Sequence, residues 1–190
     1  KKFVRILKPV EVKARDGLTL PSYLTLPVGV APKKLPLVLF VHGGPWARDE
    51  WGYHPYAQWF ANRGYAVLQV NYRGSDGFGK KFRNAALKEF AGKMHTDLVD
   101  AVGWAVKQGY ADPKKVAIMG GSYGGYATLV GVTFTPDLFA CGVDIAGPSS
   151  LVTLVESFPA YWGPYLSNTW YPFVGDPKDA KARAGLESRP

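Results

Sequence analysis

The sequence has a single cysteine, Cys141, among its 190 residues, so it cannot form an intramolecular disulfide framework. It lacks the paired Cys and His spacings of zinc sites, so we expect no metal. Cys141 lies in an apolar, strand-like pattern, and we expect its thiol to be buried. The basic N-terminal residues 1–17 lack the apolar stretch of a signal peptide. Together these absences favour a reducing, cytoplasmic location.

Long apolar runs and basic clusters are also missing. No run approaches the roughly 20 apolar residues of a membrane-spanning helix, so we expect no membrane association. The net charge is +8, but the 23 Lys and Arg residues are spread along the chain. No basic helix or aromatic-basic stripe is present, and we expect no nucleic-acid partner.

Nucleotide-binding signatures are absent or imperfect. No G-x-G-x-x-G pattern follows any of the expected strands. The stretch from Gly74 to Lys81 resembles a P-loop, but its last position is lysine where a Mg²⁺-binding hydroxyl is needed. We therefore interpret this stretch as a surface loop and expect no cofactor.

Hydrophobic patterning predicts strands that alternate with helices. Residues 3–26 read as an antiparallel hairpin around the Asp16-Gly17 turn, and 27–36 and 74–92 as loops. Four apolar runs that end in glycine predict buried strands, and helical spacing of apolar residues predicts the helices between them. The strands are expected at 35–44, 65–74, 114–121 and 138–147, and the helices at 55–63, 94–108 and 123–133.

This alternation is typical of an α/β fold with a mostly parallel sheet, opened here by an antiparallel hairpin. The length suits one domain over residues 1–190. We expect Thr96 or Asp97 to cap the second helix and Gly109 to end it. Functional residues of such sheets gather at the carboxyl ends of the strands.

A glycine-rich turn at one such end contains Ser122. The segment from Gly120 to Gly124 matches G-x-S-x-G between an apolar strand and a helix, which is the context of a nucleophile elbow. A sharp strand-to-helix turn exposes the serine Oγ, and the flanking glycines keep side chains out of the turn. The alternative is a serine that merely caps the helix.

A second glycine-rich segment, from His42 to Pro45, follows the first of the four apolar strands. Acyl transfer needs two N–H donors directed at the developing oxyanion. One normally comes from the residue after the nucleophile, here Tyr123, and the other from the loop after this strand. We assign the second donor to Gly44. His42 itself is expected to be hydrogen-bonded beneath the loop rather than to act as a base.

The motifs together resemble the prolyl oligopeptidase family of serine peptidases, especially its acylaminoacyl-peptidase and dipeptidyl-peptidase-like branches. The resemblance rests on VLFVHGGPW, VLQVNYRGSDGFG, MHTDLVDAVGWAV and VAIMGGSYGGYATL, which occur in family order. It implies an α/β-hydrolase catalytic domain, usually preceded by a β-propeller. It also implies Ser122 as nucleophile, Gly44 and Tyr123 as oxyanion hole, and hydrolysis of peptide, acyl-peptide or ester bonds through an acyl-enzyme.

The sequence departs from this family in its histidines. In the α/β-hydrolase fold the triad follows the order Ser, Asp or Glu, then His. His42, His54 and His95 all precede Ser122. Either the chain lacks the last strand–helix units of a longer enzyme, on the order of 60 residues at about 30 per unit, or another chain supplies the acid and base. The third alternative, that His54 or His95 acts as the base, is the least favoured.

An aromatic, proline-containing segment follows the last expected strand. Within it, Trp162 and Tyr165 are candidate walls of a pocket for an apolar or aromatic substrate side chain. The alternative is that these rings pack against a further part of the protein.

Two further expectations concern partners and function. Residues 138–146 would form an apolar edge strand, which favours a homo-oligomer or a swapped dimer. The alternatives to a serine peptidase are a carboxylesterase without a propeller and a catalytically inert member of the fold.

Overall fold

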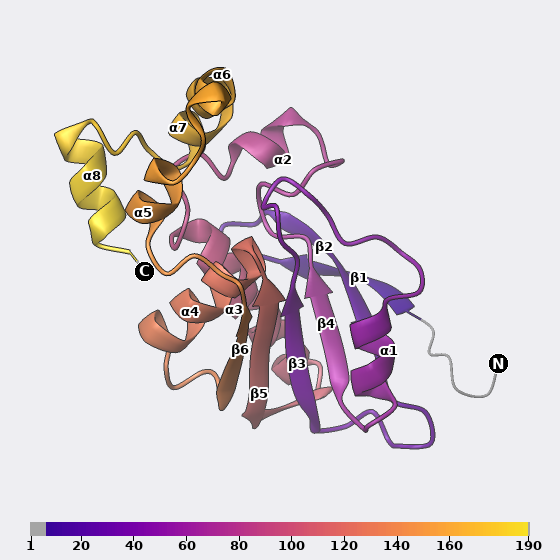
Figure 1. The fold of residues 1–190 in the computed structure, drawn as a ribbon. Helices are drawn as coiled ribbons and strands as arrows, with labels where there is room; N and C mark the ends of the chain where they lie inside the picture. The colour runs from indigo at the N-terminus through magenta and orange to yellow at the C-terminus, as the bar shows by residue number, and fades with distance from the viewer. Residues whose placement is uncertain (1–6, 190) are drawn as a thin grey trace.

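The computed structural model describes residues 7–189, and a six-stranded sheet lies at its centre (Figure 1). The strand order is β1-β2-β4-β3-β5-β6. β1 and β2 form an antiparallel hairpin, β2 runs antiparallel to β4, and the other neighbours are parallel. The predicted sheet is confirmed, although residues 3–6 of the predicted hairpin lie outside the described residues. The strands are β1 (Leu7–Lys13), β2 (Thr19–Thr25), β3 (Leu35–Val41), β4 (Ala66–Val70), β5 (Ala111–Gly121) and β6 (Cys141–Ile145).

Helices cover both faces of the sheet because the central strands are apolar on both sides. In β3, Leu37 and Leu39 contribute to the large core formed with α3 (Lys93–Lys107) and α4 (Tyr123–Phe134). The alternate residues Val38 and Phe40 pack in a smaller cluster with α1 (Pro55–Ala61) on the opposite face. The predicted helices are therefore confirmed, with boundaries shifted by one or two residues.

The predicted cap of α3 was wrong, although the helix begins within one residue of its predicted start. Gly92 occupies the N-cap position, and neither Thr96 nor Asp97 caps the helix. The Asp97 carboxylate is fully buried and bonded to Arg73 instead, so a tertiary ion pair replaces the expected local cap. The other end agrees with the prediction, because Gly109 follows the C-cap residue with a φ of 81°.

The segment predicted as one loop over residues 74–92 contains the short helix α2 (Lys80–Asn84). After β6 the chain forms a further set of short helices, which sequence patterning did not predict. Figure 1 shows α5 to α8 gathered near the carboxyl ends of the parallel strands, with α2 on the same side of the sheet. These helices are α5 (Leu151–Glu156), η1 (Ala160–Trp162), α6 (Gly163–Tyr165), the π-helical turn η2 (Leu166–Trp170), α7 (Tyr171–Phe173) and α8 (Ala180–Glu187).

Strand β6 is one of the two edges of the sheet, which confirms its predicted edge position. All five of its residues are exposed, including Cys141, Val143 and Ile145. The expectation that the Cys141 thiol is buried was therefore wrong. Its apolar pattern is that of a covered strand, but among the described residues β6 has a neighbour only on the β5 side. No helix within residues 7–189 has the length and apolarity needed to cross a membrane.

Candidate active site

Ser122 lies on a strained turn between β5 and α4. Its φ of 54° and ψ of −119° lie in a region that non-glycine residues rarely adopt, and such strain is concentrated at functional sites. The backbone is fixed there because Ser122 N donates to Ile145 O at 3.0 Å and Tyr126 N donates to Ser122 O at 3.0 Å. The tight turn therefore holds the serine in a defined orientation.

The Ser122 hydroxyl does not cap α4. Although Ser122 occupies the N-cap position, its side chain makes no capping hydrogen bond. Ser150, at the start of α5, shows what an ordinary cap looks like, since its Oγ accepts from Thr153 N at 3.3 Å. Within residues 7–189, no hydrogen bond joins Ser122 Oγ to a histidine or a carboxylate. This geometry disfavours the helix-cap interpretation and leaves the hydroxyl available.

Two glycines of the turn are required by close backbone contacts. A Cβ on Gly124 would lie 2.1 Å from Val41 O, and one on Gly120 would lie 2.6 Å from the same oxygen. Both separations are too short for any side chain. The absence of Cβ atoms therefore lets the first turn of α4 rest directly on the carboxyl end of β3.

The loop after β3 lies against Ser122. A Cβ on Gly43 would be 3.4 Å from Ser122 Cβ, so the two backbones approach closely. Gly44 follows with a φ of 120°, which favours glycine. Gly44, Ser122 and Tyr123 line one cavity. The three residues that the sequence assigned to nucleophile and oxyanion hole are thus brought together.

His42 lies beneath this loop and is buried. Its Nδ1 is 2.8 Å from Gly43 O, and its Nε2 is 2.9 Å from Ser75 Oγ. Burial lowers the pKa of His42 to about 4, so the imidazole is neutral at physiological pH. These contacts agree with the structural role predicted for His42.

The other two histidines are also bound away from the serine. His54 caps α1, where its Nδ1 accepts from Ala57 N at 3.3 Å. His95 lies in α3 with its Nε2 3.3 Å from Thr135 Oγ1. Burial lowers the pKa of both imidazoles. Neither histidine contacts Ser122.

The cavity beside Ser122 has a volume of about 550 Å³. Trp162 and Tyr165, the candidate wall residues, both line it, and their rings meet edge-on with centroids 5.6 Å apart. None of the described lining residues is charged. Most of the wall was not predictable from the sequence, because the helices that supply it have no clear pattern. The missed aromatic and leucine residues are Phe90, Tyr126, Leu151, Leu154, Phe158 and Trp170.

Tyr72 links the two halves of this site. Its ring stacks on His42 with centroids 4.4 Å apart and contacts the Tyr123 ring at 5.3 Å. Its hydroxyl donates to His42 O at 2.9 Å, and Ser75 Oγ donates to Tyr72 O at 2.7 Å. The loop after β4 therefore packs directly beneath the Gly44 loop.

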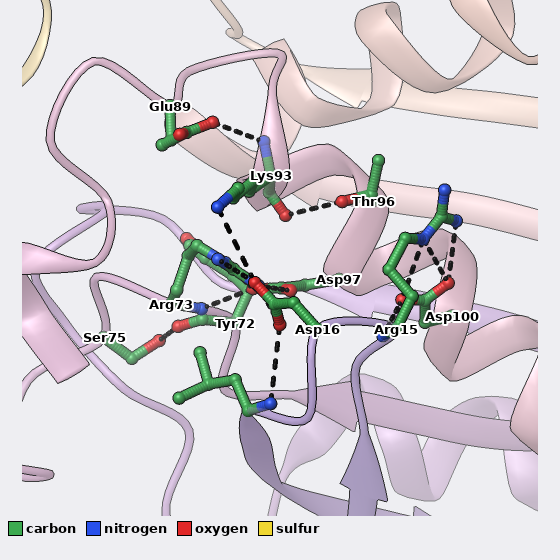
Figure 2. A network of polar contacts seen from close by, with 11 residues as sticks. Arg15, Asp16, Tyr72, Arg73, Ser75, Glu89, Lys93, Thr96, Asp97 and Asp100 are labelled. Carbon is green, nitrogen blue, oxygen red and sulfur yellow. Dashed lines mark hydrogen bonds and ion pairs between the residues drawn. The ribbon is translucent and has the colours of Figure 1, made fainter.

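An ion-pair network fixes the loop after β4 to α3 and to the first hairpin, as Figure 2 shows. Arg73 donates to Asp97 through its backbone N, Nε and Nη2, at 2.7–2.9 Å. Its guanidinium also donates to Asp16, whose pKa is lowered to about 2 chiefly by this bond. Burial alone would lower the pKa of Arg73, but these bonds raise it above its ordinary value. Arg73 therefore remains charged although it is buried.

No metal site accompanies these groups in the described part of the chain: residues 7–189 contain no group of three or more Asp, Glu, His or Cys placed to hold an ion. The groups present at the site are a strained serine, nearby backbone N–H groups, the N-terminus of a 12-residue helix and an apolar cavity.

Comparisons with known proteins agree with this architecture. The family model described as prolyl oligopeptidase family matches residues 51–187. Dipeptidyl aminopeptidase BIII from Pseudoxanthomonas mexicana is 59% identical over 95% of this chain and 27% of its own length. Dipeptidyl peptidase family member 6 from Caenorhabditis elegans is 45% identical over 94% of this chain and 27% of its own length.

A solved structure of a peptidase has the same fold as this chain. A puromycin-hydrolyzing peptidase from Mycobacterium tuberculosis superposes with a TM-score of 0.86 at 30% identity, covering 98% of this chain and 29% of that protein. The chain thus spans between a quarter and a third of the length of these relatives. The family match and the shared fold lead to one conclusion: the chain belongs to the prolyl oligopeptidase family and has the α/β-hydrolase fold of that family's catalytic domains.

Proposed function

We propose that this protein is a serine peptidase that cleaves peptide or acyl-peptide bonds with Ser122 as its nucleophile. The observation that carries the proposal is the strained Ser122 backbone, with its uncapped hydroxyl on the wall of an apolar cavity. The names of the relatives, which are peptidases, support a peptide substrate.

In the proposed reaction, Ser122 Oγ attacks the carbonyl carbon of the scissile bond while a general base takes its proton. The carbonyl π electrons move to the oxygen and form an oxyanion. When the tetrahedral intermediate collapses, the C–N bond breaks, and the amine leaves with the proton returned by the same group. Water then cleaves the acyl-enzyme by the same steps and restores the serine.

The oxyanion would be held by the backbone N–H groups of Gly44 and Tyr123. Their closeness to Ser122 supports this assignment, as does the N-terminus of α4, whose dipole favours negative charge. Removing one such donor from a serine protease costs on the order of 10²–10³ in kcat. The backbone donors therefore account for a large share of the expected rate.

The acid and base are proposed to lie outside these 190 residues. The three histidines support this, since each has other partners and none contacts Ser122. The greater length of the relatives also leaves room for these groups. A second chain that supplies them remains the alternative. The proposal that residues 1–190 form one incomplete catalytic domain rests on the same observations.

The cavity favours an apolar or aromatic substrate side chain. Its described lining is uncharged, half of the lining residues are aromatic, and we assign Trp162 and Tyr165 to its walls. A charged side chain would lose its hydration there without gaining an ion pair. We therefore expect neutral, bulky residues next to the scissile bond.

An oligomer formed through β6 and a cytoplasmic location both stay predictions. The exposed Val143 and Ile145 on an edge strand support self-association. Light scattering coupled to size-exclusion chromatography tests self-association. We expect the wild-type protein to have a mass above that of the monomer, and we expect Val143→Lys to lower that mass. A monomer at all concentrations would contradict it.

The function is tested by kinetics on two substrates with the protein that contains this chain. We expect hydrolysis of a blocked peptide anilide as well as a p-nitrophenyl ester, and loss of both activities in Ser122→Ala. Ser150→Ala is the matched control, because it removes a hydroxyl from another helix start. Ester cleavage without anilide cleavage would favour a carboxylesterase, and the absence of both would favour the inert alternative.

A further inference from the structure

A buried carboxyl–amide pair lies beside the Gly44 loop. Asp49 follows Gly44 by five residues, and its side chain meets Gln69 on β4. The exposed fractions of the two residues are 6% and 1%. Gln69 Nε2 donates to Asp49 Oδ1 at 2.8 Å. The two side chains are thus in direct contact in the interior.

The remaining oxygen of each group has no hydrogen-bond partner. Asp49 Oδ2 and Gln69 Oε1 are both buried and find no hydrogen-bond partner within residues 7–189. An ionised carboxylate and an amide oxygen are both acceptors only, so neither can satisfy the other. A single proton on Asp49 Oδ2 changes this, because its O–H can then donate to Gln69 Oε1. One proton therefore accounts for both unpartnered atoms.

We propose that Asp49, in its protonated form, is joined to Gln69 by two reciprocal hydrogen bonds, and that this protonated pair positions the loop that bears Gly44. Asp49 is thus a positioning residue, which acts on the site through the loop backbone. The second part of this inference rests on the proposed function, because it gives Gly44 a role in binding the oxyanion.

The surroundings of Asp49 favour the neutral form. Gln69 is paired with Phe40 and Tyr23 in the sheet register, and no cation is recorded as a partner of Asp49 among residues 7–189. Its chain neighbours Arg48 and Glu50 pair with each other at 3.7 Å. Burial raises the pKa of Asp49 to about 6, and the Gln69 hydrogen bond opposes only part of this rise.

Other titratable groups nearby add no positive charge near neutral pH. His54, at the start of α1, has its pKa lowered by burial. Tyr72 is coupled electrostatically to Asp49, and burial raises its pKa well above the ordinary value, so it stays neutral. Apart from Arg48, which pairs with Glu50, no cation among residues 7–189 is placed to favour ionisation of Asp49.

The backbone of Asp49 transmits the effect to the loop. Asp49 N donates to Asn71 Oδ1 at 2.8 Å, and Asn71 Nδ2 donates to Asp49 O at 3.2 Å. With the Gln69 bond, these contacts fasten the Gly44 loop to the end of β4 on one side. The contacts of His42 fasten it on the other side. Ionisation of Asp49 would place an anionic oxygen against Gln69 Oε1 and weaken the first attachment.

The direction of the pH dependence follows from the raised pKa. A group with a higher pKa in the folded than in the unfolded protein stabilises the fold at low pH and loses that contribution as pH rises. For Asp49 the loss begins near the unfolded value of about 3.9 and is complete just above about 6. Over this interval the folding equilibrium constant should fall by about 100-fold from this residue alone.

The test is the variant Asp49→Asn, whose amide can form the same two bonds at every pH. Urea unfolding of wild type and Asp49→Asn should give similar stability near pH 4. The ratio of their folding constants should then rise by about 100-fold in favour of Asp49→Asn and level off above about pH 6.5. The matched control, Asp100→Asn, makes the same change at a carboxylate bonded to Arg15 and should show no such gain.

Two further measurements examine the protonation of Asp49 and the contribution of its hydrogen bonds separately. ¹³C NMR titration of the Asp49 carboxyl should give a midpoint near 6, whereas a midpoint near 3.9 or a flat stability ratio would overturn the proposal. Asp49→Ala, which leaves the Gln69 amide unpartnered, should be less stable than Asp49→Asn throughout. If Ser122 proves unreactive, the proposed function fails. The stability measurements still show whether Asp49 and Gln69 form the proposed hydrogen-bonded pair.

The pH dependence of acylation tests whether Asp49 positions the Gly44 loop. The rate constant for acylation of Ser122 should fall with pH above about 6 more steeply in wild type than in Asp49→Asn, with little difference in KM. Parallel profiles for the two proteins would contradict a role in positioning Gly44.

Discussion

The buried ion pair between Arg73 and Asp97 supports a quantitative prediction. Asp97 is 0% exposed and the Arg73 side chain 4%, so both charges are removed from water. In Asp97→Ala, three hydrogen bonds from Arg73 lose their acceptor. Asp16 can still accept from the guanidinium, but it lies at a partly exposed edge. Breaking a buried pair on one side costs about 3–5 kcal/mol, because an uncompensated charge remains.

A similar change at the surface provides the comparison. Arg15 and Asp100 form an ion pair of the same length, 2.7 Å, but the exposed fractions are 59% and 15%. Exposed pairs contribute about 0–1 kcal/mol. Asp100→Ala should therefore lower the free energy of unfolding several-fold less than Asp97→Ala, although each variant removes one carboxylate that pairs with an arginine.

Urea unfolding followed by circular dichroism measures this difference. A loss of 3–5 kcal/mol should also lower the Tm by roughly 6–20 °C, at 2–4 °C per kcal/mol for a domain of this size. The double variant Arg73→Met with Asp97→Leu should recover most of the loss, because it leaves no buried charge. Equal costs for Asp97→Ala and Asp100→Ala would refute the argument that burial makes the Arg73 pair important.

Two other substitutions test the turn and the cavity. Gly124→Ala should prevent the first turn of α4 from resting on β3 and abolish folding or activity, since its Cβ would lie 2.1 Å from Val41 O. The control Gly163→Ala should fold normally in a thermal melt, because its Cβ would meet no atom of residues 7–189 within 4 Å. Trp162→Leu should raise KM for substrates with an aromatic side chain more than for small ones, whereas the exposed Tyr161→Leu should leave KM unchanged in the same steady-state assay. Equal KM values for Trp162→Leu and wild type would remove Trp162 from the proposed wall.

The sheet and the serine turn were predictable because local signals and tertiary structure agree there. Apolar runs over residues 35–44, 65–74 and 114–121 are long enough to mark central strands, and each ends in glycine. Gly120 and Gly124 are required by contacts with Val41, so the local motif already contains the tertiary constraint.

The errors arose where distant contacts decide the outcome. Asp97 has a good local sequence for a helix cap, but its ion pair with Arg73 provides more favourable contacts for its carboxylate. Cys141 has a buried-strand pattern, but among residues 7–189 its strand has a neighbour only on the β5 side, so the residue is exposed. The pairing of Asp49 with Gln69 joins a loop to a strand and has no sequence signature.

The lining of the cavity also depends on contacts between residues that are distant in the sequence. Trp162 and Tyr165 were recognisable because aromatic residues are dense after the last strand. Phe90 comes from a segment predicted as a plain loop, and its place in the wall depends on how that segment packs against α4. Sequence patterning therefore identified the strained serine turn but only part of the cavity beside it.

The central claim, that Ser122 is the nucleophile, is tested most directly by peptide mass spectrometry after treatment with a fluorophosphonate. A nucleophilic serine displaces fluoride and keeps the phosphonyl group, so we expect one stoichiometric adduct on the tryptic peptide that contains Ser122. Prior denaturation and Ser122→Ala should both abolish it. An adduct on another residue, or none in the active protein, would contradict the account.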